Sequence, residues 1–174
     1  MRYLFLALTV VIDLIFTGAV FPNINIMGIA PDIIICTMAS FAALEKSLTS
    51  AAVGFICGLA LDIMFTGTIG FYTLPYFVVG MGLYFISSRF RYIDPVLLPE
   101  AFAVGAYFVK EIVMALLAYM LGLNLSLGHR FLRFILPEML ATGILMLLVH
   151  LIFKRLYRSG SIRPKGMEDL KKLL

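Results

Sequence analysis

The sequence predicts an all-α membrane protein, a compact bundle of six transmembrane helices with both termini in the cytoplasm. Three observations predict this fold class. The chain of 174 residues is 62% hydrophobic and 14% charged, whereas a soluble domain is about half apolar and about a quarter charged. The apolar residues form long runs rather than an alternating pattern. The basic residues gather between these runs and at the C-terminal end.

Six apolar runs are long enough for the predicted helices. A membrane-spanning helix needs about 20 apolar residues, and fewer where it crosses a thin region. In chain order the runs cover residues 3–21, 30–44, 48–65, 69–87, 97–121 and 134–153. Together they predict a single transmembrane bundle over residues 1–153. The basic segment 154–174 is predicted to be a cytoplasmic tail.

The flanking residues justify the runs in order. Pro22 ends the first run, which we expect to stay uncleaved because Asp13 breaks its likeness to a signal peptide. Pro31 opens the second run, and Lys46 separates it from the third. The third and fourth runs are joined by the uncharged segment 66–68. The fifth follows a loop with two arginines, and the sixth leads into the basic tail.

The basic residues also predict the orientation of the bundle. Of the 14 Lys and Arg residues, 11 fall on one side, two fall on the other, and Lys110 lies within a run. Because basic loops favour the cytoplasmic side, both termini are predicted to be cytoplasmic. The same distribution accounts for the net charge of +4 without a nucleic-acid partner. The basic tail either contacts anionic lipid of the bilayer or only fixes the topology.

Ionisable residues within the runs predict a polar region, because such groups are costly in a membrane and usually face the bundle interior. With a rise of about 1.5 Å per residue, most of them fall in the outer half of the bilayer. This predicted outer cluster contains Asp32, Asp62, Lys110, Glu111 and Glu138. Three prolines that can free backbone carbonyls fall at the same depth, namely Pro31, Pro75 and Pro137.

Two compatible interpretations of the outer cluster stay open. One is a polar cavity open toward the outside. The other is a set of ion pairs, such as Asp62 with Lys110, that lock helices together. Glu111 follows Lys110 directly and lies on a different side of the helix, so we expect it to be poorly placed to pair with that lysine.

A stripe of small residues predicts close helix packing. Ser50, Gly54, Gly58 and Asp62 are spaced by four, so they share one face of the third helix. Small side chains let a neighbouring helix approach closely, and Asp62 adds a polar contact to the same face. A second stripe on the fourth helix includes Tyr76 and Gly80. The predicted packing and docking residues are Ser50, Gly54, Gly58, Asp62, Tyr76 and Gly80.

The sequence lacks the motifs of common enzymes. It contains no GxSxG, HExxH or Walker A motif. Cys36 and Cys57 lie inside apolar runs, whereas a zinc site needs about four ligands. His129 and His150 have no nearby ligand partners in the sequence. We therefore expect no enzyme activity, no cofactor and no metal.

The segment 31–80 carries a family resemblance. It reads PDIIICTMASFAALEKSLTSAAVGFICGLALDIMFTGTIGFYTLPYFVVG. This segment resembles the rod shape-determining protein MreD family of bacteria. The matching residues are Pro31, Asp32, Gly54, Phe55, Gly58, Leu59, Asp62, Gly67, Gly70, Leu74, Tyr76 and Gly80. Beyond this segment the likeness lies in length and hydropathy.

The resemblance implies a multi-pass protein of the bacterial inner membrane. Members of the family are components of the elongation machinery (elongasome) and are not known as enzymes. They sit with MreC, the actin-like MreB, a SEDS glycosyltransferase and a transpeptidase, and they maintain cell shape and lateral cell-wall synthesis. Their fold is similar to the S component of energy-coupling factor vitamin transporters, which has six helices and an outward-facing pocket.

Three functional hypotheses follow. The leading one is a non-enzymatic scaffold that docks an MreC-like protein, with either that partner's helix or another helix of this chain on the glycine stripe. The alternative is a small-molecule-binding S-component-type subunit whose pocket is lined by the outer cluster. S components present alanines four apart on their first helix, however, and Ala7 and Ala19 are not so spaced. A proton- or ion-coupled carrier is the third hypothesis, although no inverted repeat is evident.

Overall fold

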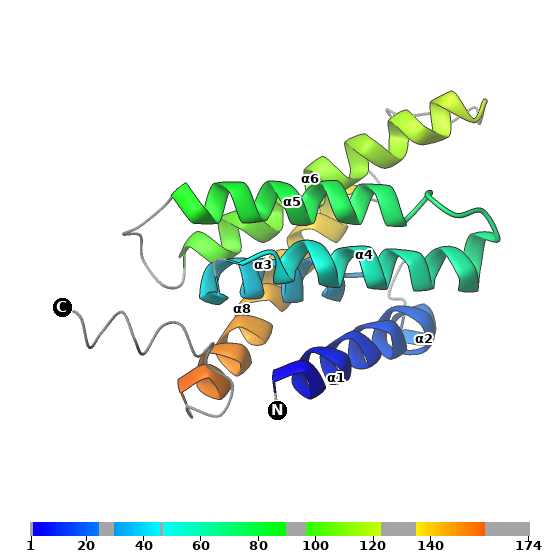
Figure 1. Cartoon of the computed structure of the whole chain (residues 1–174). Coiled ribbons are helices and arrows are strands. Elements are labelled where there is room, and N and C mark those ends of the chain that lie inside the picture. The colour runs from blue at the N-terminus through cyan, green and yellow to red at the C-terminus, as the bar shows by residue number, and fades with distance from the viewer. Residues whose placement is uncertain (1, 25–29, 46, 90–96, 123–134, 159–174) are drawn as a thin grey trace.

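The computed structural model describes residues 2–24, 30–45, 47–89, 97–122 and 135–158. All regular structure in these ranges is helical, and it forms one bundle (Figure 1). The prediction of an all-helical fold is therefore confirmed for this part of the chain. The tail prediction for 159–174 and both arginines of the loop 122–133 lie outside the described residues.

Six helical segments correspond to the six predicted runs. The first comprises α1 (Arg2–Ile15), the π-helix η1 (Phe16–Val20) and α2 (Phe21–Ile24), and the second is α3 (Ile33–Glu45). The third comprises α4 (Thr49–Leu61) and the π-helix η2 (Asp62–Thr66), and the fourth is α5 (Thr73–Arg89). The last two are α6 (Leu97–Met120) and α8 (Leu136–Arg158).

Four of these segments are long and apolar enough to cross a membrane. They are Leu4–Asn23, Thr49–Thr66, Glu100–Met120 and Leu136–Arg155. Large apolar side chains on their outer faces are exposed, for example Ile144 at 67% and Leu8 at 57%. An exterior of this kind is suited to contact with lipid rather than with water. The chain is therefore a membrane protein, while the predicted orientation of its termini stays a prediction.

The short helix α3 is the centre of the bundle. Nearly all of its residues are buried, from Ile33 to Ala42 and again at Glu45. It packs against α1, α4, α5, α6 and α8, and Figure 1 shows it lying behind α4 and enclosed by the longer helices. A helix that is apolar on every side is stable only when it is surrounded. Its 13 residues span only about 20 Å, which is less than the hydrocarbon thickness of a bilayer.

Several predicted boundaries were wrong by a few residues. The fourth helix begins at Thr73 instead of residue 69, because Gly67 and Gly70 have φ angles of 63° and 116° and turn the chain before it. The first segment continues past Pro22 to Ile24. The sixth helix continues to Arg158, so the predicted tail begins as helix.

Pro75 and Pro137 do not lie in the middle of their helices. Pro75 lies in the first turn of α5, and Pro137 lies in the first turn of α8. The first residues of a helix have no intrahelical acceptor for their N–H groups, so proline removes no hydrogen bond there. The expectation that Pro75 frees a carbonyl group for a cavity was therefore wrong. Ile135 is already helical before α8 and residues 131–134 lie outside the described part of the chain, so the expectation for Pro137 stays a prediction.

Candidate functional site

The glycine stripe of α4 is covered by α5 of the same chain. A Cβ atom added to Gly58 would lie 2.7 Å from the Cα atom of Thr73, and one added to Gly54 would lie 2.7 Å from the carbonyl oxygen of Tyr76. From the other side, a Cβ on Gly80 would lie 2.6 Å from the Cα atom of Ala51. The two backbones therefore touch along the stripe, and a larger side chain at any of these glycines would separate them.

A hydrogen bond joins the same two helices at the start of the stripe. The Ser50 hydroxyl donates to the carbonyl oxygen of Gly80 over 3.1 Å, and Ser50 is fully buried. Tyr76 is buried as well, at 3% exposure. The glycine stripe was expected to contact either a helix of a partner protein or another helix of this chain. In the structure it contacts α5 of this chain.

Asp62 ends the stripe and organises the turn between α4 and α5. Its carboxylate accepts hydrogen bonds from the backbone N–H groups of Gly70 (2.7 Å), Tyr72 (2.7 Å) and Thr73 (3.0 Å). The Thr73 hydroxyl donates a fourth bond, over 2.5 Å. These donors account for a carboxylate that is completely buried. Asp62 therefore holds the first turn of α5, and the predicted pair with Lys110 was wrong.

A second polar site forms where α3 begins. The Oδ2 atom of Asp32 accepts hydrogen bonds from the Tyr76 hydroxyl (2.7 Å) and from the Lys110 ammonium (3.1 Å). Its Oδ1 atom accepts the N–H of Ile35 over 3.2 Å, so Asp32 also caps the N-terminus of α3. Asp32 and Lys110 are both more than nine-tenths buried. Lys110, on α6, thus pairs with the carboxylate that caps α3, the helix at the centre of the bundle.

The ammonium of Lys110 has two further neighbours. Its Nζ atom lies 3.0 Å from Oε1 of Glu111. The expectation that Glu111 is poorly placed was wrong, because two long side chains can meet even when their Cβ atoms leave the helix in different directions. The same Nζ atom lies 4.5 Å from the centre of the Tyr107 ring, a cation–π contact.

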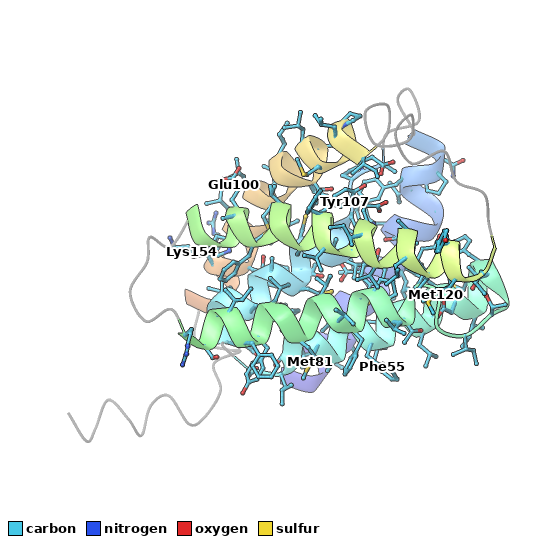
Figure 2. The ribbon with its side chains drawn as sticks, turned by 90° about the horizontal axis from the view of Figure 1, so that it is seen from above. Phe55, Met81, Glu100, Tyr107, Met120 and Lys154 are labelled. Carbon is cyan, nitrogen blue, oxygen red and sulfur yellow. The ribbon has the colours of Figure 1, made fainter. Side chains whose placement is uncertain are left out.

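The helix α8 joins the site through two polar groups. The Tyr107 hydroxyl donates a short hydrogen bond to Glu138, and Figure 2 shows Tyr107 on the side of α6 that faces α8. The Thr142 hydroxyl accepts the backbone N–H of Asp32 over 3.0 Å. We call the whole set the Asp32 cluster, and its members are Asp32, Tyr76, Tyr107, Lys110, Glu111, Glu138 and Thr142.

The structure thus brings together four of the five residues of the predicted outer cluster. Asp32, Lys110, Glu111 and Glu138 belong to the Asp32 cluster, while Asp62 lies in the separate turn before α5. Sequence reasoning missed Tyr107 and Thr142. Their spacing could have indicated both residues. Tyr107 lies three residues before Lys110, and Thr142 lies four residues after Glu138, so each shares a helix face with a predicted residue.

A third buried carboxylate lies on α1. Asp13 is fully buried, and its Oδ2 atom is 2.7 Å from the hydroxyl of Thr37 on α3. Its Oδ1 atom has no hydrogen-bond partner among the described residues, and neither has the hydroxyl of Thr17 one turn later. The sequence placed Asp13 within the first helix, but no pattern indicated that Thr37 would face it.

The arrangement of these groups is suited to holding helices together. The charges of the Asp32 cluster bond one another directly, which matches the interpretation as a lock between helices. Among the described residues, no three His, Cys, Asp or Glu side chains are grouped so that they could hold a metal ion. Cys36 and Cys57 are buried and free.

These features define a helical membrane protein whose buried polar groups join its own helices into one body. The family model for the rod shape-determining protein MreD matches residues 1–160, so the chain belongs to the MreD family. Membership confirms the resemblance of segment 31–80 and implies a structural, rod-shape-determining role. No curated protein and no solved structure was found to match the chain. The likeness to S components therefore stays a prediction.

Proposed function

We propose that this chain is a non-enzymatic scaffold of the bacterial inner membrane that docks an MreC-like membrane protein. Through that partner it supports cell shape and lateral peptidoglycan synthesis, together with MreB, a SEDS glycosyltransferase and a transpeptidase. The observation that carries the proposal is that the buried polar groups of this MreD-family chain bond its own helices to one another. Asp62 bonds the start of α5, and Asp32 bonds Lys110. Such bonds hold the bundle in one arrangement, as a docking platform requires.

The position of the glycine stripe limits where the partner can dock. Because α5 covers Gly54 and Gly58, the partner must use the outward faces of the bundle. Apolar side chains such as Leu8, Ile144 and Leu148 are exposed there. These faces offer van der Waals packing to a transmembrane helix, the main source of helix association in lipid.

Affinity purification from membranes tests the proposal. The tagged full chain is purified in mild detergent from its own host, and an equally abundant multi-pass protein with the same tag is the control. We expect the MreC-like protein to copurify with this chain alone. Depletion of the chain is expected to round the cells and to reduce labelled peptidoglycan in the side wall. A chain that captures no MreC-like protein, in cells that stay rod-shaped after depletion, would overturn the proposal.

The ligand-binding alternative has one observation in its favour. Four of the residues expected to line its pocket do meet, in the Asp32 cluster. That hypothesis predicts a small molecule that copurifies with the chain and raises its melting temperature by mass action. Mass spectrometry of the denatured, purified protein detects such a molecule, and its absence would leave the scaffold as the explanation of the cluster.

A further inference from the structure

An apolar groove lies between α5 and α6 on the outside of the bundle. Its volume is about 300 Å³, and every residue that lines it is apolar. Each wall contains a row of residues four apart with a glycine in the middle. The rows are Val78, Gly82 and Ile86 on α5, and Ala101, Gly105 and Val109 on α6. Val78, Ile86 and Val109 are 40–47% exposed, so the groove opens to the surroundings of the bundle.

The two glycines of the groove differ from the other helical glycines. An added Cβ atom on Gly54, Gly58 or Gly80 would collide with another helix or its side chains. An added Cβ on Gly82 or Gly105 would meet no atom within 4 Å. Among the described helical residues these two glycines are alone in this respect, and both border the same groove. Glycine weakens a helix because it lacks a side chain. What Gly82 and Gly105 contribute in return is the open space of the groove.

The size and chemistry of the groove select its occupant. A groove of about 300 Å³ holds slender groups, whereas a whole α-helix, about 10–12 Å wide with its side chains, can only pack across its opening. A hydrocarbon chain is slender and wholly apolar, and it is the molecule that surrounds the middle of a spanning helix.

One charge marks the end of the groove where a lipid headgroup would lie. Arg89 is exposed in the last turn of α5, three residues after Ile86 and seven after Gly82, and so on the same helix face. The basic loops predict that this end is cytoplasmic, the side on which anionic lipids attract basic residues. Figure 2 shows Glu100, the acidic residue in the first turn of α6, on the side of that helix away from α5.

We propose that this groove binds one acyl chain of an anionic phospholipid, with the lipid phosphate at Arg89. The lipid fills the space beside Gly82 and Gly105 and covers the joint between α5 and α6. This site is separate from the Asp32 cluster and does not depend on which protein the scaffold docks.

Native mass spectrometry of the full chain tests the proposal. The protein is extracted into micelles that contain equal amounts of phosphatidylglycerol and phosphatidylcholine, and bound lipids are counted. We expect the wild-type chain to retain phosphatidylglycerol in preference to phosphatidylcholine. The exchange Arg89→Gln is expected to reduce this preference by about fivefold, the factor that one basic residue near an anionic surface supplies. Arg155→Gln, which removes an exposed arginine of α8, is the matched control and keeps the preference.

Filling the groove tests the acyl-chain part separately. We expect Gly82→Leu and Gly105→Leu to lose binding of phosphatidylglycerol and of phosphatidylcholine alike. Ala52→Leu, on an exposed face of α4, is expected to keep the binding of the wild type. Circular dichroism checks that each variant is folded. Folded groove variants that retain phosphatidylglycerol like the wild type would overturn the proposal, as would an unchanged preference in Arg89→Gln. Release of a bound protein instead of lipid from Gly82→Leu would show that a partner helix occupies the groove.

Discussion

The three buried aspartates among the described residues differ in how fully they are bonded. Asp62 accepts four hydrogen bonds from Gly70, Tyr72 and Thr73. Asp32 has an ammonium, a phenol and a backbone N–H as donors. Asp13 has one hydroxyl neighbour and one oxygen without a partner in the described part of the chain. Buried polar groups stabilise a fold only when they are bonded, so the three should respond differently to the same substitution.

Replacing Asp62 is expected to destabilise the protein. In Asp62→Leu the buried N–H and hydroxyl of Thr73 lose their acceptor, as do the part-buried N–H groups of Gly70 and Tyr72. Each buried unsatisfied donor costs about 1–3 kcal/mol, so the two donors of Thr73 predict a loss of at least about 2 kcal/mol. Asp62→Asn keeps one acceptor oxygen and should lose less. Thermal unfolding in detergent measures both, with the exposed Met64→Leu as control. A Leu variant as stable as the wild type would contradict the role of Asp62.

Replacing Asp13 is expected to have the opposite effect. Asp13→Leu removes a buried acid that is bonded on one side only. The Thr37 hydroxyl keeps its contact with the carbonyl oxygen of Ile34, at 2.9 Å, so no new unpaired group arises. We expect the melting temperature to stay equal or rise, because replacing an incompletely bonded polar group by an apolar one is neutral or favourable. A clear decrease would show that the carboxylate of Asp13 stabilises the bundle and would contradict this expectation.

At the residue scale, the sequence predicted which residues share a helix face better than it predicted which residues contact one another. The spacing of four placed Ser50, Gly54, Gly58 and Asp62 on one face because helix geometry fixes that relation. The donors to Asp62 come from the turn after η2, and no periodicity encodes where the N–H groups of a turn point. The pair of Lys110 with Asp32 joins elements 78 residues apart, and hydropathy carries no information on such contacts.

At the scale of elements, the hairpin of α4 and α5 depends on backbone contact. The stripe of α4 meets Thr73 and Tyr76, and Gly80 of α5 meets Ala51. The turn held by Asp62 closes the hairpin at one end. Tight packing of this kind makes the two helices a unit, in which small residues are required along the whole contact.

Gly58→Leu is therefore expected to disrupt the hairpin. Its side chain would have to occupy the position of the Thr73 backbone, which cannot move aside as a flexible side chain can. Overpacking typically costs about 1–3 kcal/mol, and contact with backbone should place this variant at the upper end. Ala52→Leu, on the exposed side of the same helix, is the control. Melting temperature and membrane level are measured, and Gly58→Leu equal to the control would refute close packing here.

Within the described residues the sequence predicted the number of helical segments, but it did not predict how deeply each one lies in the bundle. Each apolar run produced one helical segment, because a long apolar run favours a helix wherever backbone groups cannot bond water. The run 30–44 gave no sign that α3 is enclosed by other helices, since a lipid-facing helix and a protein-covered one have the same apolar composition. The start of α5 was misplaced because residues 69–72 are as apolar as the helix that follows them.

At the scale of the whole molecule, the Asp32 cluster connects four helices. Asp32 precedes α3, Tyr76 belongs to α5, Lys110 to α6 and Thr142 to α8. Segments from both halves of the chain therefore meet at one buried point. Because α3 is covered by these helices, the cluster determines whether the bundle stays closed around its centre.

Breaking the central ion pair is expected to destabilise the entire bundle. Lys110→Met leaves Asp32 buried without its counter-ion, and removing one partner of a buried pair typically costs about 3–5 kcal/mol. The double variant Asp32→Asn with Lys110→Met removes both charges and should lose less than the sum of the single variants. A double-mutant cycle of unfolding free energies measures the coupling. Additive losses would mean that the two charges do not interact.

The enclosed position of α3 also has a consequence for synthesis. Asp32 leaves the ribosome 78 residues before Lys110. At about 5–20 residues per second, the acid waits roughly 4 to 16 seconds for its counter-ion. During that interval α3 has neither α6 nor α8 around it, and it is too short to span the bilayer by itself. During synthesis the buried acid of this protein is therefore without its counter-ion until the later helices have been made.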